Sequence, residues 1–149
     1  MPLRVYLDTS VFSAYYDEAV SDRRTQTEEF WERRTEFEVS TSVLAREELE
    51  QTPDPARRTQ VLGLLEGISL HPISPQMRDL ASRYIEAGRF TPVMYNDALH
   101  VAAAVLTRQD VLLSWNFRHL VNRRRRAQVN EVNISLGLPV IDIVAPPEI

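Results

Sequence analysis

Short apolar segments alternate with longer segments of helical character along the whole chain. Five segments have the composition of buried strands, namely residues 3–7, 37–41, 68–73, 111–114 and 140–144. The segments between them are expected to be helical, namely residues 10–17, 22–34, 43–51, 55–66, 74–87, 95–108 and 124–136. Such alternation is typical of a parallel sheet with helices on both faces. The sequence therefore predicts an α/β fold in three layers, α/β/α, around a central parallel sheet.

The chain has the size and composition of one domain, which we expect to span residues 1–149. No repeat or low-complexity linker divides it, and no apolar run approaches the roughly 18 residues needed to span a bilayer. The first apolar segment contains Arg4 and runs directly into Asp8, which is unlike a signal peptide. The absence of cysteine excludes disulfides, thiolate metal sites and cysteine nucleophiles, and is compatible with a reducing cytoplasm.

The charge pattern is less simple than the net charge of -4, which argues against a general nucleic-acid binder. All 17 basic residues are arginine, the side chain best suited to bidentate phosphate contacts. The run Arg123–Arg126 stands near the start of a predicted helix, where positive charge is unfavourable unless an anion binds. The run is either a solvated helix start or a surface for RNA or an acidic partner.

The first predicted strand ends in an acid, Asp8, which is followed by two hydroxyl residues, Thr9 and Ser10. In open parallel sheets, ligands bind beyond the carboxyl ends of the strands. Asp8 is therefore a candidate for chemistry, although an aspartate here can equally cap the next helix, as can Thr9 or Ser10.

Three further polar positions could meet Asp8. Asn116 follows the predicted strand 111–114 and should lie at the same sheet edge, whereas Glu47 and Glu48 lie on the helix after the second strand. Asp97 lies in the first turn of a helix that precedes a strand, and by the simplest rule it does not fit that edge. Taken singly, these residues could be solvated, could complement a helix dipole or could belong to a turn.

A cluster of carboxylates would need a cation, because like charges raise one another's pKa. Oxygen ligands without cysteine favour Mg²⁺ or Mn²⁺ over zinc. The chemistry expected of such a site is metal-assisted phosphodiester hydrolysis, with a water activated by the metal as the nucleophile.

Four segments in this order resemble the motifs of PIN domains: residues 6–12 (YLDTSVF), 43–49 (VLAREEL), 96–102 (NDALHVA) and 114–120 (SWNFRHL). The resemblance covers nearly the whole chain, and its first and third motifs are the most specific. PIN domains are α/β/α nucleases, many of them VapC-type toxins of bacterial toxin–antitoxin pairs. The resemblance implies a cytoplasmic Mg²⁺- or Mn²⁺-dependent endoribonuclease with an RNA substrate, an antitoxin partner and a homodimeric state.

Site residues carried over from the family are Asp8 as the first acid, Glu48 (or its neighbour Glu47) as the second and Asp97 as the third. Asn116 stands where many members carry a fourth aspartate, and this departure should lower metal affinity. Thr9 and Ser10 are expected to support Asp8 or a bound water.

Two other functions compete with this one. A non-catalytic PIN-like module that binds RNA or protein is suggested by Asn116 in place of an acid. A flavodoxin-like or response-regulator-like domain with Asp8 as phospho-acceptor is disfavoured, because the chain has no lysine.

Residues outside the four acidic and amide positions are expected to be mainly structural. We expect His100 to be a satisfied core group, with contact to the site as its alternative. For His119, a role near the substrate is the less favoured alternative. Phe30 and Trp31 are expected in the core, with a dimer interface as the alternative.

Overall fold

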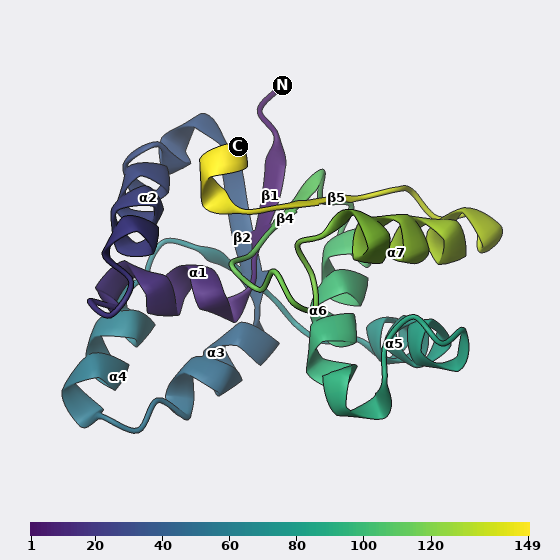
Figure 1. Ribbon diagram of the computed structural model, residues 1–149, viewed down its shortest axis with the longest axis horizontal. Coiled ribbons are helices and arrows are strands. Elements are labelled where there is room, and N and C mark those ends of the chain that lie inside the picture. Colours follow the sequence, from purple (N-terminus) through teal and green to yellow (C-terminus); the bar gives the residue numbers. More distant parts are fainter.

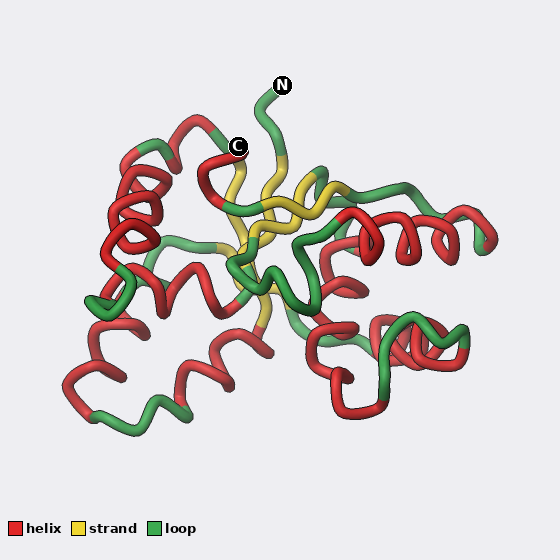
Figure 2. Tube along the Cα trace, viewed as in Figure 1, coloured by secondary structure: helices red, strands yellow, loops and turns green.

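The computed structural model describes residues 1–149 and contains a single five-stranded sheet in which every pair of neighbouring strands is parallel. The strand order is β3-β2-β1-β4-β5. Figure 2 shows the strands in yellow between two groups of helices. The strands are β1 (Arg4–Leu7), β2 (Glu38–Ser42), β3 (Ser69–His71), β4 (Val111–Leu113) and β5 (Asp142–Val144).

Seven α-helices form the two outer layers (Figure 1). One layer contains α1 (Thr9–Ser13), α2 (Ser21–Glu32), α3 (Val43–Glu50) and α4 (Pro55–Gly63), and the other contains α5 (Pro75–Glu86), α6 (Tyr95–Leu106) and α7 (Arg123–Ser135). Short 3-10 turns lie at Ala14–Tyr16, Arg34–Glu36, Pro92–Met94 and Pro146–Glu148. The predicted three-layer α/β/α fold is confirmed. No helix combines the length and hydropathy needed to cross a membrane.

Alternating side chains of the strands explain why helices cover both faces. Val5 and Leu7 of β1 pack in the core beneath α1–α4, whereas Tyr6 between them packs in the core beneath α5–α7. In β4, Val111 and Leu113 pack beneath α1–α4, whereas Leu112 packs beneath α5–α7. Because successive strand residues point to opposite faces, a strand that is apolar on both faces must be covered on both.

The ends of several helices differ slightly from the predicted ones. The segment predicted as one helix over residues 10–17 is α1 followed by a 3-10 turn. The helix is capped by Asp8 and not by Thr9 or Ser10, because the Asp8 carboxylate accepts a hydrogen bond from the Ser10 backbone N–H. α4 ends at Gly63, earlier than the predicted residue 66, and the chain continues in turns.

Phe30 and Trp31 of α2 belong to the core and do not form a free surface. Their exposed fractions are 2% and 3%, and the Trp31 Nε1–H donates to the Val11 carbonyl at 3.3 Å. The core location of the two rings is confirmed, whereas a role of their helix in a dimer stays a prediction.

The strand order creates one position where two crossover connections leave in opposite directions. From β1 the chain moves to β2 and β3 on one side, and then returns to β4 and β5 on the other side. In open α/β sheets, ligands bind in the crevice at this position, outside the carboxyl ends of the strands. Asp8 directly follows β1, and Ser114 directly follows β4 at the same edge. The topology therefore predicts that a ligand binds among the groups around Asp8.

Candidate functional site

Asp8 is a buried carboxylate held by two serines. Its exposed fraction is 5%. Oδ1 accepts from the backbone N–H of Ser10 at 2.9 Å and from the Ser10 hydroxyl at 2.5 Å, and Oδ2 accepts from the Ser114 hydroxyl at 2.8 Å. Burial raises the pKa of Asp8 above its usual value, although His100 and these hydrogen bonds oppose the effect. All the hydrogen-bond donors to this carboxylate are neutral, so its charge has no hydrogen-bonded cationic partner.

Glu48 is bound to groups other than those that hold Asp8. Its Oε1 accepts from the Thr9 hydroxyl at 2.6 Å and lies 2.5 Å from His100 Nε2. Burial alone would raise the pKa of Glu48, but the hydrogen bond and charge of His100 lower it below its usual value. Glu47 is exposed, so Glu48 is the glutamate that faces this site. Thr9 supports Glu48 and not Asp8, whereas Ser10 supports Asp8 as expected.

His100 lies at the centre of the acidic groups. It is 2% exposed, and its Nδ1 is 2.8 Å from the hydroxyl of Tyr6, which in turn lies 2.7 Å from the hydroxyl of Ser42. Burial alone would lower the pKa of His100, but Glu48, and after it Asp8 and Asp97, raise it. His100 is therefore the satisfied core histidine that we expected. It is also the group whose pKa is raised by all three acids.

Asp97 lies at the same edge, although the simplest rule did not place it there. Its Oδ2 is 2.9 Å from Nδ1 of His119, which follows β4. The geometry has a simple cause. A helix that leads into a parallel strand must run antiparallel to that strand, so α6 begins near the carboxyl edge.

Asn116 shapes the loop that follows β4. Its Oδ1 accepts from the His119 backbone N–H at 2.9 Å, and its own backbone N–H donates to the Ser114 hydroxyl at 2.9 Å. The turn interpretation of Asn116 therefore holds. A carbonyl oxygen has two acceptor sites, so this contact leaves one free for a second ligand.

The acids do not form a ready metal cluster. No group of three or more histidine, cysteine, aspartate or glutamate side chains has the geometry of a metal site. Glu48 pairs with His100 and Asp97 with His119, while Asp8 bonds only neutral donors. The donor set of carboxylate and amide oxygens still fits a hard divalent cation, and Asp8 is the buried charge that such a cation would neutralise.

Comparison with known proteins identifies the family. The model of the PIN domain matches residues 5–132. The chain belongs to the PIN domain family. PIN domains are generally nucleases. No curated protein sequence is significantly similar to the chain.

Three solved structures, one of them described as a toxin, are similar in fold to the chain. VapC20 of Mycobacterium tuberculosis, described as a sarcin–ricin loop cleaving toxin, superposes with a TM-score of 0.64 at 11% identity, covering 77% of this chain and 92% of that one. The DNA-bound VapBC of Salmonella typhimurium superposes with a TM-score of 0.61 at 19% identity, covering 97% of this chain and 98% of that one. FitAcB of Neisseria gonorrhoeae superposes with a TM-score of 0.63 at 11% identity, covering 97% of this chain and 99% of that one. At these identities the similarity shows the fold.

The sequence patterns of this PIN domain did not reveal two hydroxyl groups that support the site. Ser114 and Tyr6 carry no role in the sequence patterns beyond that of strand residues, yet Ser114 binds Asp8 and Tyr6 binds His100. A local signal was present in both cases, since a serine directly after an apolar strand and a tyrosine within one each bring a hydroxyl to the sheet. Their partners, however, lie 106 and 94 residues away along the chain.

Proposed function

We propose that this PIN domain is a metal-dependent endoribonuclease and the toxin of a type II toxin–antitoxin pair. The observation that carries the proposal is the buried carboxylate of Asp8, which receives hydrogen bonds only from neutral donors, at the crevice between β1 and β4. Glu48 and Asp97, which are partly exposed, extend the acidic site toward solvent. The proposed ligands of Mg²⁺ or Mn²⁺ are Asp8, Glu48, Asp97 and Asn116.

Other side chains of the protein would orient the proposed metal ligands. A bound divalent cation would supply an activated water and neutralise charge on the phosphate. Ser10 and Ser114 fix both oxygens of Asp8, and Thr9 and His100 orient Glu48. Because His100 is hydrogen-bonded to Glu48 and His119 to Asp97, the two histidines orient these acids.

The proposed partners follow from the proposed function. VapBC-5 of Mycobacterium tuberculosis, a structure of similar fold, is described as a member of the VapBC family of toxin–antitoxin systems, and the Salmonella structure is a VapBC bound to DNA. We carry over an antitoxin partner, a homodimeric state and a cytoplasmic location, where RNA is available, as parts of the proposal.

The direct test is incubation of the purified chain with a mixed single-stranded RNA and, separately, with single-stranded DNA. We expect internal cuts in the RNA with Mn²⁺ and none after EDTA is added. Cleavage that persists in EDTA would contradict metal dependence, and cleavage of DNA alone would contradict a ribonuclease.

A second function, a binding module without turnover, is favoured by one observation, the asparagine at position 116. We expect Asn116→Asp to tighten Mn²⁺ binding by about tenfold, because each added carboxylate raises the affinity of an oxygen site. An aspartate keeps the turn, since its carboxylate can also accept from the His119 N–H. Calorimetric titration measures the change.

The same titration separates the two functions. A wild-type chain that binds no Mn²⁺ at millimolar concentration and cuts no RNA is the binding module. Unchanged Mn²⁺ affinity in Asn116→Asp would remove position 116 from the ligand set.

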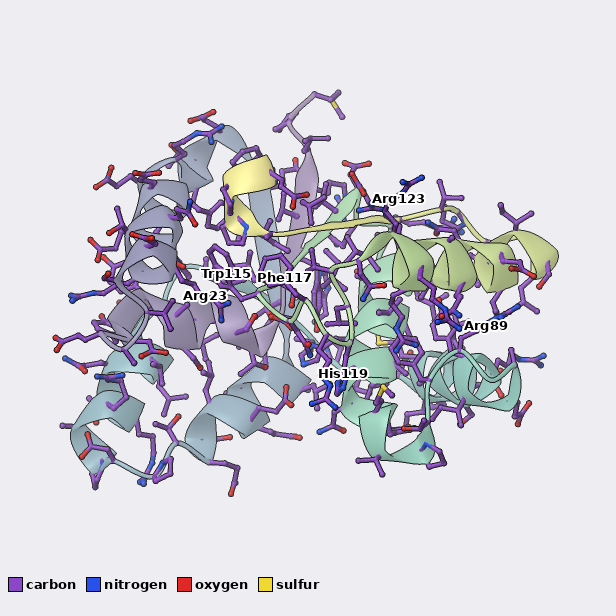
Figure 3. The ribbon with its side chains drawn as sticks, in the orientation of Figure 1. Arg23, Arg89, Trp115, Phe117, His119 and Arg123 are labelled. Carbon is purple, nitrogen blue, oxygen red and sulfur yellow. The ribbon has the colours of Figure 1, made fainter.

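An exposed aromatic group beside the site suits a base of the RNA. Phe117 is 46% exposed, lies edge-on to Trp115 at 6.0 Å between ring centroids, and has the Arg23 guanidinium 5.9 Å away (Figure 3). Stacking on such a ring contributes roughly 1–3 kcal/mol per base. We expect Phe117→Ala to weaken binding of single-stranded RNA about fivefold to a hundredfold, measured by fluorescence anisotropy. Phe117→Tyr keeps a ring and should bind like wild type; equal losses in both variants would contradict stacking.

A further inference from the structure

Four arginines surround a small cavity next to the candidate active site. The cavity has a volume of about 300 Å³ and lies between the turn at residues 88–94 and the first turns of α7. No carboxylate lines it. Its cationic lining residues are Arg89, Arg118, Arg124 and Arg125.

Two of these guanidinium groups have unused donors. The Nε atoms of Arg89 and Arg125 are buried and have no hydrogen-bond partner. Arg125 lies 4.1 Å from the ring centroid of Phe90, and its polar side-chain contact is with the sulfur of Met94 at 3.5 Å. Arg89 donates through Nη2 to Glu131, whose side chain is 70% exposed. A buried donor without an acceptor is costly, so a ligand that accepts from it binds favourably.

The helix adds to the positive potential of this cavity. α7 begins at Arg123, and only Asn122 caps its first turn, by accepting from the Arg125 backbone N–H at 2.7 Å. A helix N-terminus carries partial positive charge. An anion bound there is therefore stabilised, whereas nearby cations are destabilised. Burial lowers the pKa of Arg125 and the charge of Arg124 contributes in the same direction, although the charge of Asp97 opposes them. An anion would relieve both effects.

We propose that this cavity is a phosphate site, which holds a backbone phosphate of the RNA while a neighbouring part of the strand lies at Asp8, Glu48 and Asp97. The proposal rests on the proposed function and adds a substrate-binding site to it. Guanidinium groups bind phosphate oxygens through paired, charge-assisted hydrogen bonds.

Continuity with the active site favours RNA over an acidic protein segment. Arg118 lies in the same short loop as Asn116 and His119, and His119 is bonded to Asp97. A strand that crosses the acids therefore passes directly to the arginines. RNA carries one phosphate per nucleotide, so a strand placed at the site brings a further phosphate to the neighbouring cavity.

The test compares two double variants with equal loss of charge. Arg118→Gln/Arg124→Gln removes two lining groups. Arg78→Gln/Arg123→Gln removes two arginines that do not line the cavity, one of them adjacent to Arg124 in the sequence. Figure 3 shows Arg89 and Arg123 on opposite sides of α7. Arg125 is left in place because its packing on Phe90 supports the fold.

Binding is measured by anisotropy of a short, labelled single-stranded RNA in EDTA at several salt concentrations. We expect Arg118→Gln/Arg124→Gln to bind about tenfold more weakly, and the slope of log K against log salt to flatten by about 0.7 for each phosphate that the variant no longer neutralises. The control variant should stay within about twofold of wild type. Equal losses in the two variants would overturn the proposal in favour of general charge attraction.

Two further measurements, of peptide binding and of RNA cleavage, identify the ligand and distinguish this inference from the proposed function. If the cavity variant loses affinity for an oligoglutamate peptide but not for RNA, the proposal is overturned and the cavity takes a protein. In cleavage assays we expect the cavity variant to raise KM with kcat unchanged; cleavage with unaltered KM would overturn the phosphate site and leave the ribonuclease. RNA binding that depends on the cavity in a chain without cleavage would support the phosphate site and overturn the ribonuclease.

Discussion

Asp8→Asn is expected to reduce Mn²⁺-dependent RNA cleavage by at least about a hundredfold, the effect typical of losing one preorganised electrostatic group in an active site. Asp8 is the one proposed ligand whose charge is buried and bonded only by neutral groups. The amide has nearly the same shape, and its oxygen can still accept from the Ser10 N–H, so the cap of α1 persists. Because burial raises the pKa of Asp8, removing its charge should leave the unfolding midpoint unchanged or higher.

A matched control separates the catalytic role of Asp8 from its capping role. Asp54 caps α4 by accepting from the Arg57 N–H at 2.7 Å and lies at an exposed position. Asp54→Asn makes the same chemical change at a helix start, and we expect it to keep full cleavage activity. If Asp8→Asn cleaves RNA as fast as Asp54→Asn does, Asp8 is only a cap and the proposed active site is wrong.

Trp31→Ala is expected to have the largest effect on stability, lowering the free energy of unfolding by about 3–5 kcal/mol. The indole is 3% exposed, packs edge-on against Phe12 at 5.5 Å and donates to the Val11 carbonyl. Domains of this kind are stable by roughly 5–15 kcal/mol, so much of the margin would be lost. Trp115 is the only other tryptophan and reports urea unfolding of the variant by its fluorescence.

Val93→Ala is the control for this measurement. Val93 is 95% exposed, so we expect a change within about 0.5 kcal/mol. The core interpretation of Trp31 also requires a loss that is independent of protein concentration. A loss that disappears at high protein concentration would show instead that Trp31 stabilises a dimer.

Most of the fold could be predicted from local sequence patterns. All five predicted strands and all seven predicted helices exist, with ends that differ by a few residues. The reason is that apolar strands and capped helices are encoded locally. Asp54 and Ser74 each accept a hydrogen bond from a backbone N–H three residues on, and a proline follows each of them at the start of its helix.

The edge at which Asp97 lies could have been predicted from helix direction. The sequence places this acid before a strand, and the simplest rule treats only residues after strands as edge residues. The direction of α6, which must return to the start of β4, brings its first turn to the carboxyl edge. The simplest rule is wrong here because it ignores helix direction, whereas the motif resemblance points to the correct location.

The sequence by itself determined that an α/β fold forms and that Asp8 and Asn116 follow strands of its sheet. Only the tertiary structure decided which groups hold the acids: Ser114 for Asp8, His100 for Glu48 and His119 for Asp97. The physical reason is separation along the chain, because these partners lie 106, 52 and 22 residues apart and meet only when β4 pairs beside β1 and α6 packs behind them. Local patterns encode elements, whereas hydrogen bonds between elements depend on strand order.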